Sequence, residues 1–262
     1  MHWILRGGCD SLKVHLLLKK EEIDTVQMSD DKIAVVFDVL LATSTIISCL
    51  QFGAKEVIPV MNGEEAILMA KGYKTEDVAL VGEYDGITID GFLSPAPSRL
   101  EEHVKNKTVL LSTTNGTVAI RQSAPAKEVY IASLLNGEAV SKQIIKTYDN
   151  ETIIVVCSGS SNQFCLEDFY GAGYFIEQLV KEYGLNNIEL TDSALASKIF
   201  YQNLSHEAYN VLSESRVGQM LHSHDLQQDL AFVSKQGELS IIPILLEKKI
   251  ICLEKMETCK GK

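Results

Sequence analysis

At residues 109–117 the chain reads Val109-Leu110-Leu111-Ser112-Thr113-Thr114-Asn115-Gly116-Thr117. The aliphatic first half is typical of a short buried strand. The second half carries hydroxyls, an amide and a glycine, which are typical of a tight turn that leads into a helix. Such a junction brings backbone N–H groups, hydroxyls and the positive end of a helix dipole into one small volume. We therefore expect this segment to bind an anion.

Two other hydrophobic segments, 33–37 and 153–157, also run into small polar residues. These residues are Asp38, Thr43, Ser44, Thr45, Ser158, Gly159, Ser160 and Ser161. Open α/β sheets bind their ligands at the carboxyl ends of the strands. Since all three junctions would lie at such ends, the sequence predicts one shared pocket for a small, negatively charged molecule.

Hydrophobic periodicity predicts strands and helices that alternate along most of the chain. Strands are predicted over 14–18, 33–39, 57–60, 78–81, 108–111, 129–131 and 152–157, and a terminal hairpin over 241–245 and 250–253. Helices are predicted over 43–52, 62–70, 117–123, 136–146, 166–183, 193–201 and 203–212, continuing over 215–221, and a long loop over 82–98. This alternation favours a three-layer α/β/α fold with a largely parallel or mixed central sheet. Because no linker or repeat is visible, a single domain is predicted over residues 1–262.

The acidic composition narrows the classes of partner. The 262 residues carry a formal net charge of −11 and no long basic tract, which argues against binding to nucleic acid or to an anionic membrane. Residues 16–18 are too few to span a bilayer, and residues 1–6 lack the apolar core of a signal peptide. We therefore expect a cytoplasmic protein, and the sequence leaves a homo-oligomer open. Because the overall charge repels an anionic ligand, a divalent cation such as Mg²⁺ is expected at the site.

Several short motifs follow one another in a fixed order. They are Phe37-Asp38-Val39-Leu40, Ala42-Thr43-Ser44-Thr45-Ile46, Gly82-Glu83, Gly91-Phe92, Ser112 to Thr117, Asn136, Cys157-Ser158-Gly159, Leu166-Glu167-Asp168, Ser215-Arg216-Val217-Gly218 and Asp229-Leu230. This ordered set, within residues 14–250, resembles the 2-phosphosulfolactate phosphatase family. The resemblance implies an α/β fold, dependence on Mg²⁺, and hydrolysis of the phosphate ester of 2-phospho-3-sulfolactate to sulfolactate and phosphate.

The resemblance also implies roles for several acidic residues. The predicted catalytic residues are Asp38, Glu167 and Asp168, and the predicted magnesium ligands are Asp38, Glu83, Asp168 and Asp229. Taken alone, the residue types leave structural alternatives open. Asp38 and Asp229 could cap a turn or a helix, and Glu167 and Asp168 could stabilise the dipole of the helix that they begin.

Hydrogen-bonding residues at the junctions are the predicted substrate contacts. They are Thr43, Ser44, Thr45, Thr113, Thr114, Asn115, Gly116, Thr117, Asn136, Ser158, Gly159 and Arg216. Four hydrogen-bonding side chains within residues 113–117 exceed what a single helix cap requires. Ordinary N-capping remains the alternative for residues 43–45 and for Asn136, and a solvated ion pair is the alternative for Arg216.

The chain departs from the family pattern at five positions. Leu41 and Val118 stand where the family usually has arginine, and Leu93, Ala96 and Pro97 replace parts of a loop that commonly reads Asp-x-Gly-Asn-Ser-Pro. Two lost guanidinium contacts, at roughly 1.5–3 kcal/mol each, would weaken substrate binding by about two to four orders of magnitude.

Two other arginines offer a way to compensate for this loss. Arg121 lies one helical turn beyond Val118, and Arg99 lies just after the altered loop. Three functions therefore stay open: the phosphatase of the family, a phosphatase whose pocket is reshaped by Leu93 and Pro97 for another small acid, and a catalytically impaired paralogue. The paralogue would bind a small anionic ligand as a sensor or a partner subunit.

Overall fold

The computed structural model describes residues 11–29, 31–224 and 226–253. The segment 1–6, in which we expected no signal peptide, lies outside the described residues, as do the two ends of the predicted domain. Among the described residues, no helix combines the length and the apolar character that crossing a membrane requires.

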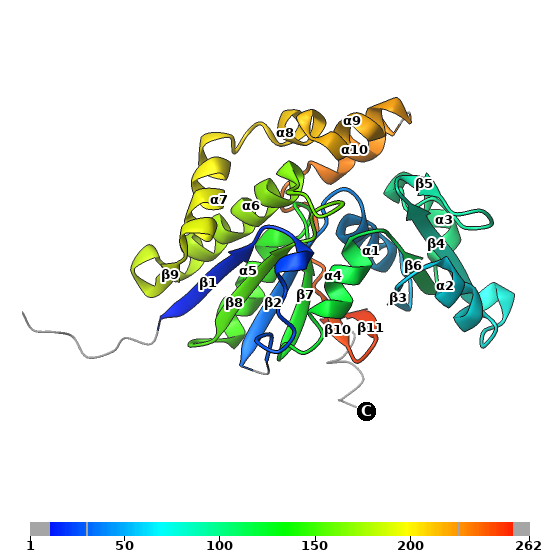
Figure 1. Ribbon diagram of the computed structural model, residues 1–262, viewed down its shortest axis with the longest axis horizontal. Helices are drawn as coiled ribbons and strands as arrows, with labels where there is room; N and C mark the ends of the chain where they lie inside the picture. Colours follow the sequence, from blue (N-terminus) through cyan, green and yellow to red (C-terminus); the bar gives the residue numbers. More distant parts are fainter. Residues whose placement is uncertain (1–10, 30, 225, 254–262) are drawn as a thin grey trace, which may run out of the picture.

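A central sheet forms the middle of the molecule (Figure 1). In the described part of the chain its strands are ordered β5-β4-β6-β3-β11-β10-β7-β2-β8-β1-β9. The strands are β1 (Leu12–Leu17), β2 (Lys32–Phe37), β3 (Glu56–Val60), β4 (Val78–Tyr84), β5 (Ile87–Thr88), β6 (Thr108–Ser112), β7 (Glu128–Ala132), β8 (Thr152–Cys157), β9 (Ile188–Leu190), β10 (Pro243–Leu246) and β11 (Lys249–Cys252).

Two parallel groups of strands make up most of this sheet. One group is β7-β2-β8-β1-β9 and the other is β3-β6-β4. The antiparallel hairpin β10–β11 lies between them, and β5 pairs antiparallel with β4. Strands β2 and β8 are buried on both faces, which explains their unbroken hydrophobic sequences. The prediction of a largely parallel, mixed sheet is confirmed.

Helices cover both faces of the sheet. They are α1 (Ala42–Gln51), α2 (Gly63–Ala70), α3 (Glu101–Val104), α4 (Gly116–Gln122), α5 (Gly137–Thr147), α6 (Leu166–Tyr183), α7 (Asp192–Asn203), α8 (Ala208–Glu214), α9 (Arg216–Ser223) and α10 (Gln227–Val233), with short 3-10 helices η1 (Lys20–Glu22), η2 (Thr75–Asp77), η3 (Pro97–Arg99) and η4 (Leu185–Asn187).

Strand β2 shows how the core divides between the two faces. Ile33, Val35 and Phe37 pack in the hydrophobic cluster that includes residues of α5 and α6. The intervening residues Ala34 and Val36 pack in a second cluster, with residues of α1 and α4. This alternation gives the predicted α/β/α layers.

Three predicted boundaries are wrong. The predicted loop 82–98 contains a hairpin, because β4 continues to Tyr84 and turns at Asp85 and Gly86 into β5. Both turn residues have positive φ, as a tight hairpin turn requires. The helix predicted from residue 203 begins instead at Ala208. The predicted continuation over 215–221 is a separate helix, since Ser215 is extended and caps α9.

Candidate functional site

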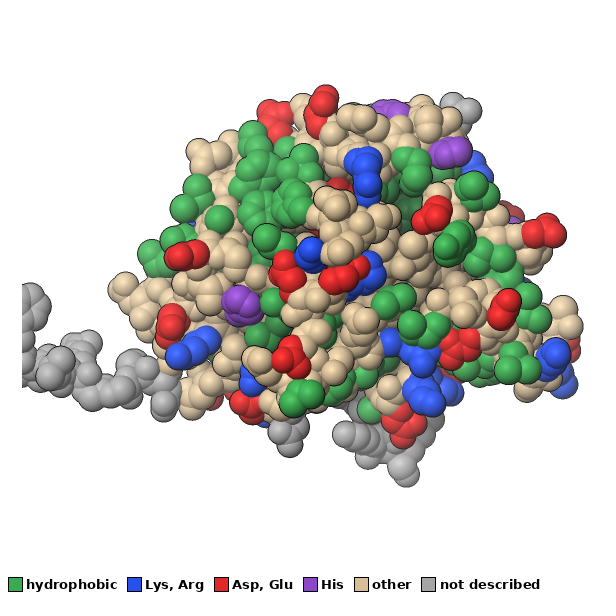
Figure 2. All heavy atoms as spheres, in the orientation of Figure 1, with side chains coloured by type: hydrophobic (Ala, Val, Ile, Leu, Met, Phe, Trp, Pro, Cys, Tyr) green, Lys and Arg blue, Asp and Glu red, His purple; other side chains and the backbone are tan. Residues whose placement is uncertain are grey.

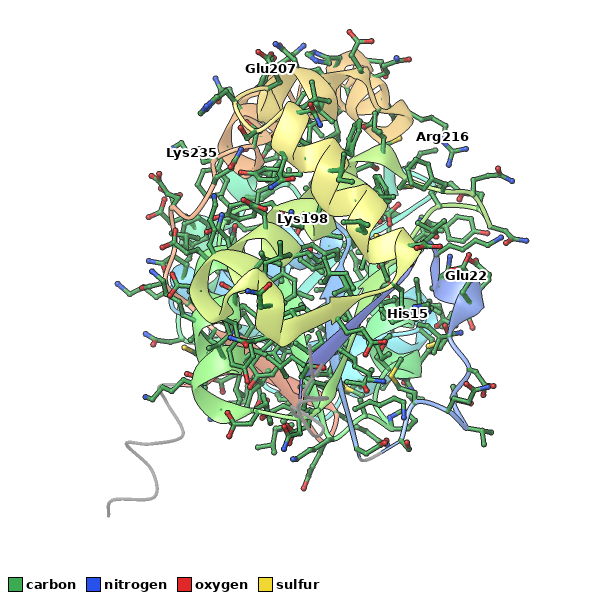
Figure 3. All side chains as sticks on the ribbon, turned by 90° about the vertical axis from the view of Figure 1, so that its left-hand side faces the viewer. His15, Glu22, Lys198, Glu207, Arg216 and Lys235 are labelled. Carbon is green, nitrogen blue, oxygen red and sulfur yellow. The ribbon has the colours of Figure 1, made fainter. Side chains whose placement is uncertain are left out.

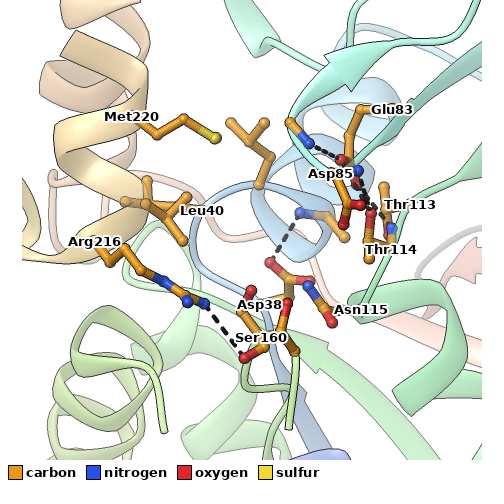
Figure 4. A pocket seen from close by; sticks show the side chains of 15 residues that line it. Asp38, Leu40, Glu83, Asp85, Thr113, Thr114, Asn115, Ser160, Arg216 and Met220 are labelled. Atoms are coloured by element: carbon orange, nitrogen blue, oxygen red, sulfur yellow. Dashed lines mark hydrogen bonds between the residues drawn. The ribbon is translucent and has the colours of Figure 1, made fainter. Parts of the chain in front are cut away.

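Segments that follow the carboxyl ends of β2, β6 and β8 contribute to the lining of a cavity of about 380 Å³ (Figure 4). The residues that line it are Asp38, Leu40, Leu41, Ala42, Glu83, Asp85, Gly86, Thr113, Thr114, Asn115, Ser160, Ser161, Arg216, Val217 and Met220. They come from the segments after all three strands, from the β4–β5 hairpin and from α9. The structure thus brings the three polar junctions to one cavity, although not every residue of those junctions faces it.

Asp38 is held at the floor of the cavity by backbone donors. The Ala42 N–H donates to its Oδ1 at 3.4 Å, and the Gly116 N–H also donates to its carboxylate. Only 7% of the residue is exposed. Burial, together with the negative charge of Glu83, raises the pKa of Asp38 to about 7. Asp38 therefore exchanges a proton near neutral pH.

Gly116 is required for this arrangement. A Cβ atom at this position would lie 2.5 Å from both Asp38 Oδ2 and the Cβ of Ala42. These distances are too short for any side chain. The glycine therefore lets the start of α4 approach the Asp38 carboxylate closely.

Glu83 is the second carboxylate of the cavity, and it comes from the end of β4. Its Oε1 accepts the Thr114 N–H at 2.8 Å. Its Oε2 accepts the Gly86 N–H at 2.7 Å and the Thr114 hydroxyl at 3.2 Å. Because Thr114 also accepts the Asp85 N–H at 2.9 Å, its hydroxyl is committed to the hairpin rather than to a ligand. Asp85 adds a third, exposed carboxylate.

One basic group lines the cavity and a second contacts a lining residue. Arg216, at the start of α9, lines it and donates from Nη2 to the Ser160 carbonyl at 3.3 Å. Lys20, in η1, donates from Nζ to Asn115 Oδ1 at 2.8 Å. Figure 3 shows Arg216 on the same side of the molecule as Glu22 of η1. In Figure 2 acidic and basic side chains gather where Figure 1 shows η1.

An apolar wall faces these polar groups. It is formed by Leu40, Leu41, Val217 and Met220. The thioether of Met220 lies against the hairpin turn, where a Cβ on Gly86 would be 2.4 Å from its sulfur. The hairpin turn and α9 therefore contact each other beside the cavity.

The predicted ligand hydroxyls of residues 43–45 are directed elsewhere. The Thr43 hydroxyl donates to the Asp38 carbonyl at 2.9 Å, and Ser44 donates to the Val39 carbonyl at 2.8 Å. Thr45 donates to the carbonyls of Leu41 and Pro95. These side chains are fully buried and none lines the cavity. These hydroxyls fix the backbone around Asp38. Their role therefore resembles the N-capping alternative more than a contact with substrate.

Thr117 also has a structural place. Its hydroxyl donates to the Thr113 carbonyl at 3.0 Å, and its N–H donates to Thr113 Oγ1 at 3.2 Å. Of the pentad 113–117, therefore, Thr113, Thr114 and Asn115 line the cavity, whereas Thr117 closes the turn behind them.

Asp168 joins two of the junctions. Its Oδ1 accepts the Val39 N–H at 2.9 Å and its Oδ2 accepts the Gly159 N–H at 3.1 Å. Burial and the charge of Asp38 raise its pKa well above the ordinary range. Burial likewise raises the pKa of Glu167, which interacts with Ser215 and Cys165. Neither acid is among the cavity-lining residues, and both support the loops around the cavity.

Asp229 and Asn136 are buried away from the cavity wall. The Asp229 carboxylate accepts the N–H and the hydroxyl of Ser98 at 2.7 and 2.8 Å. The Asn136 amide donates to the carbonyls of Ile131 and Ile241 at 3.1 Å, and it accepts the Ser133 N–H. Their side chains connect loops, and neither residue lines the cavity.

Ser158 and Gly159 lie just behind the cavity wall. Ser158 exchanges backbone hydrogen bonds with Phe37 and Lys20, and its buried hydroxyl has no partner among the described residues. Gly159 has a φ of +64°, and a Cβ there would lie 2.6 Å from the Gln163 carbonyl oxygen. The serines that reach the cavity are the next two, Ser160 and Ser161.

Among the five departures from the family pattern, only Leu41 lines the cavity. Leu93, Ala96 and Pro97 pack in the loop beside α1 and do not line the cavity. Val118 lies on α4 outside the lining.

The arginines proposed to compensate for Leu41 and Val118 lie elsewhere. Arg121 donates from Nη1 to both carboxylate oxygens of Glu65 at 2.8 Å. Arg99 is exposed on η3 and is not a lining residue. The cations at the cavity are instead Arg216 and, behind Asn115, Lys20.

Sequence reasoning missed Lys20, Asp85 and Met220. Ser160 and Ser161 belong to the recognised polar junction and line the cavity, although they were not among the predicted substrate contacts. Lys20 and Met220 carried no signal in the sequence, since Met220 lines the cavity and Lys20 contacts Asn115 through elements that are distant in the chain.

The donor set fits a divalent cation held by two carboxylates. Asp38 and Glu83 line one cavity, where burial and then the charge of Glu83 raise the pKa of Asp38, and a bound cation would lower it again. Mg²⁺ often uses one or two carboxylates, with waters and phosphate oxygens as the other ligands. Among the described residues, no cluster of three or more His, Cys, Asp or Glu side chains could hold a metal. The four predicted ligands Asp38, Glu83, Asp168 and Asp229 therefore do not form one cluster.

Comparison with known proteins places this architecture among its relatives. The family model described as 2-phosphosulpholactate phosphatase matches residues 17–248. A probable 2-phosphosulfolactate phosphatase of Clostridium botulinum (strain Alaska E43 / Type E3) is 36% identical over 244 residues, covering 92% of this chain and 100% of that protein. Proteins of the same name from Clostridium perfringens (strain SM101 / Type A) and Symbiobacterium thermophilum are 37% identical over 235 residues and 35% identical over 226 residues. These alignments cover 88% and 85% of this chain, and 92% and 95% of the relatives.

Proposed function

We propose, from the fact that the chain belongs to the 2-phosphosulfolactate phosphatase family, that it hydrolyses the phosphate ester of 2-phospho-3-sulfolactate to sulfolactate and phosphate. The observation that carries the proposal is the cavity in which two carboxylates, Asp38 and Glu83, face the Asn115 amide and the Arg216 guanidinium. Carboxylates that can hold a cation, opposite donors that can bind an oxyanion, are what a phosphomonoester requires.

Magnesium is part of the proposal. Asp38 and Glu83 would hold the ion, which would offset the charge on the phosphate oxygens. The positive charge would also keep Asp38 ionised near neutral pH, against the burial that raises its pKa.

The chain's own groups would then act on the phosphoester. Arg216 donates charge-assisted hydrogen bonds to the phosphate or the acid end of the substrate. An ionised Asp38 accepts a hydrogen bond from water and orients it toward phosphorus. Leu40, Leu41 and Met220 on the apolar wall exclude other water, which strengthens the polar contacts inside.

A non-catalytic anion-binding role is the second candidate, favoured by Leu41. This residue places an aliphatic side chain on the cavity wall where a guanidinium would bind an acid group of the substrate. Such a protein would bind the anion as a sensor or a partner subunit.

Phosphate release from a panel of phosphorylated hydroxyacids tests these proposals. The panel contains 2-phospho-3-sulfolactate, 2-phospholactate and 2-phosphoglycerate, each assayed with Mg²⁺ and with a chelator. We expect turnover of the sulfonated ester with Mg²⁺, its loss with the chelator, and at least a hundredfold fall in Asp38→Asn.

Asp192→Asn is the matched control, since Asp192 is exposed on α7 and its replacement makes the same change of charge. Turnover of another acid alone would reassign the substrate. Stabilisation by these compounds without turnover would favour the binding role. Turnover unaffected by the chelator would reject magnesium.

A further inference from the structure

Lys20 is a poorly exposed lysine whose surroundings are unusual for this residue type. Only 11% of its side chain is exposed, and it forms an ion pair with Glu21 at 2.9 Å. Its backbone N–H donates to the Ser158 carbonyl at 3.1 Å, which ties η1 to the segment after β8. The ion pair with Glu21 uses one of the three ammonium donors, so the direction of the other two calls for a structural explanation.

The contact with Asn115 supplies that explanation. Lys20 Nζ lies 2.8 Å from Asn115 Oδ1. An ammonium group has three donors and no acceptor, so the amide atom that faces it must be the oxygen. If the amide rotated by half a turn, its NH₂ group would face the ammonium with no acceptor between them. The lysine therefore holds the Asn115 amide in one of its two orientations.

The orientation of the Asn115 amide determines whether its oxygen or its NH₂ group is available to a ligand in the cavity. With Oδ1 bound to Lys20, the Nδ2 hydrogens are left as donors, and the described residues give them no hydrogen-bond partner. Figure 4 shows the Asn115 side chain beside Asp38 at the cavity. An amide N–H group at this place can donate to an anion, whereas the carbonyl oxygen would repel it.

We infer that Lys20 is a positioning residue that makes Asn115 present its amide donors to the phosphate in the cavity. Lys20 is not among the cavity-lining residues, so it acts through Asn115 rather than by touching the phosphate itself. The inference rests on the proposed function for the identity of the anion, and it adds a residue that governs how tightly phosphate binds.

The test measures binding of inorganic phosphate by calorimetry, which requires no turnover. The variants are Lys20→Met, Lys20→Arg, Asn115→Ala, Asn115→Asp and the double variant Lys20→Met with Asn115→Ala. We expect Lys20→Met to weaken phosphate binding about 10-fold or more, and Lys20→Arg to restore most of it, because arginine is also a donor without an acceptor. Asn115→Asp keeps an acceptor for Lys20 but removes the donors, so it should abolish binding.

The double variant separates positioning from a general effect of charge. If Lys20 acts through Asn115, then Lys20→Met has little further effect in the Asn115→Ala background. Lys13→Met is the control, since Lys13 is exposed on β1, pairs with Glu189 and gives the same change of net charge. Thermal unfolding of each variant shows that it is folded.

Several results would overturn the inference. They are equal losses from Lys20→Met in both backgrounds, no loss in either, failure of Lys20→Arg to restore binding, or a wild-type protein that does not bind phosphate. The proposed function fails separately, when phosphate binds and responds to these changes but no ester of the panel is hydrolysed. In a protein that does hydrolyse an ester, Lys20→Met should raise KM about 10-fold with a smaller change in kcat.

Discussion

Replacing Asp38 by asparagine has a pH-dependent effect on stability that follows from its burial. In the metal-free protein, burial and the charge of Glu83 raise the pKa of Asp38 from its ordinary 3.8 to about 7. Between these two pH values the folded state holds a proton that the unfolded state has lost. The free energy of unfolding therefore falls as the pH rises through this window. Asp38→Asn removes the titrating group, so this part of the fall should disappear.

The magnitude follows from the size of the pKa shift. At about 1.36 kcal/mol per unit, the ionised Asp38 destabilises the metal-free protein by roughly 4 kcal/mol at pH 8 and by roughly 2 kcal/mol at pH 5. The stability of Asp38→Asn relative to wild type should therefore increase by about 2–3 kcal/mol between pH 5 and pH 8. A weakened hydrogen bond from the Ala42 N–H costs about 1 kcal/mol at both pH values, so it leaves the difference unchanged.

Urea unfolding in the presence of a chelator measures this difference. Free energies of unfolding are extrapolated to water at pH 5, 6, 7 and 8 for the wild type, for Asp38→Asn and for the control Asp192→Asn. Curves of wild type and Asp38→Asn that run parallel over this range would refute the reasoning. A stability difference that is greater at pH 5 than at pH 8 would refute it as well.

Three further substitutions test the arrangement around the cavity. Gly116→Ala should lower the free energy of unfolding by about 1–3 kcal/mol in urea titrations and abolish phosphate release, because its methyl group would overlap the Asp38 carboxylate. Arg216→Ala should weaken calorimetric phosphate binding about 10-fold or more, whereas Arg121→Ala, whose side chain is paired outside the cavity, should leave it unchanged. Asp229→Ala should lower the melting temperature while the Mg²⁺ affinity measured by calorimetry stays constant, because its carboxylate holds a loop and does not face the cation site.

The central strands could be predicted because a short, continuous hydrophobic sequence is stable only where both faces of the strand are buried. In β2 and β8 every residue after the first is buried, and such a run is hydrophobic throughout. The hairpin at Asp85 and Gly86 was missed because the residue types that make a tight turn are also typical of a loop. The break at Ser215 was missed since the residues on both of its sides favour a helix. Local sequence therefore does not decide either structure. At the hairpin, contacts with Thr114 and Met220, which are distant in the chain, hold the turn in place.

The site could be predicted as a region more reliably than residue by residue. Strand ends placed Asp38 and Asn115 at one cavity, as their positions in the chain suggested. Thr43 has the same chemistry as Thr113, yet its hydroxyl is used by a backbone carbonyl while Thr113 reaches the cavity wall. The two threonines differ because a backbone carbonyl at the start of α1 accepts the Thr43 hydroxyl. The sequence does not show which backbone groups at a helix start need a side-chain partner. Lys20 reaches Asn115 because η1 is tied to the segment after β8, a pairing of distant parts of the chain.

The charges around the cavity explain why a cation belongs in the proposed reaction. The carboxylates of Asp38, Glu83 and Asp85 line it, against the single guanidinium of Arg216 and an ammonium, Lys20, that is turned toward Asn115. A phosphoester entering this cavity meets an excess of negative charge. Two events can remove that excess: protonation of Asp38, which burial favours up to about pH 7, or a cation between Asp38 and Glu83. Only the second keeps Asp38 ionised to orient water, and for this reason the proposed reaction includes a metal ion.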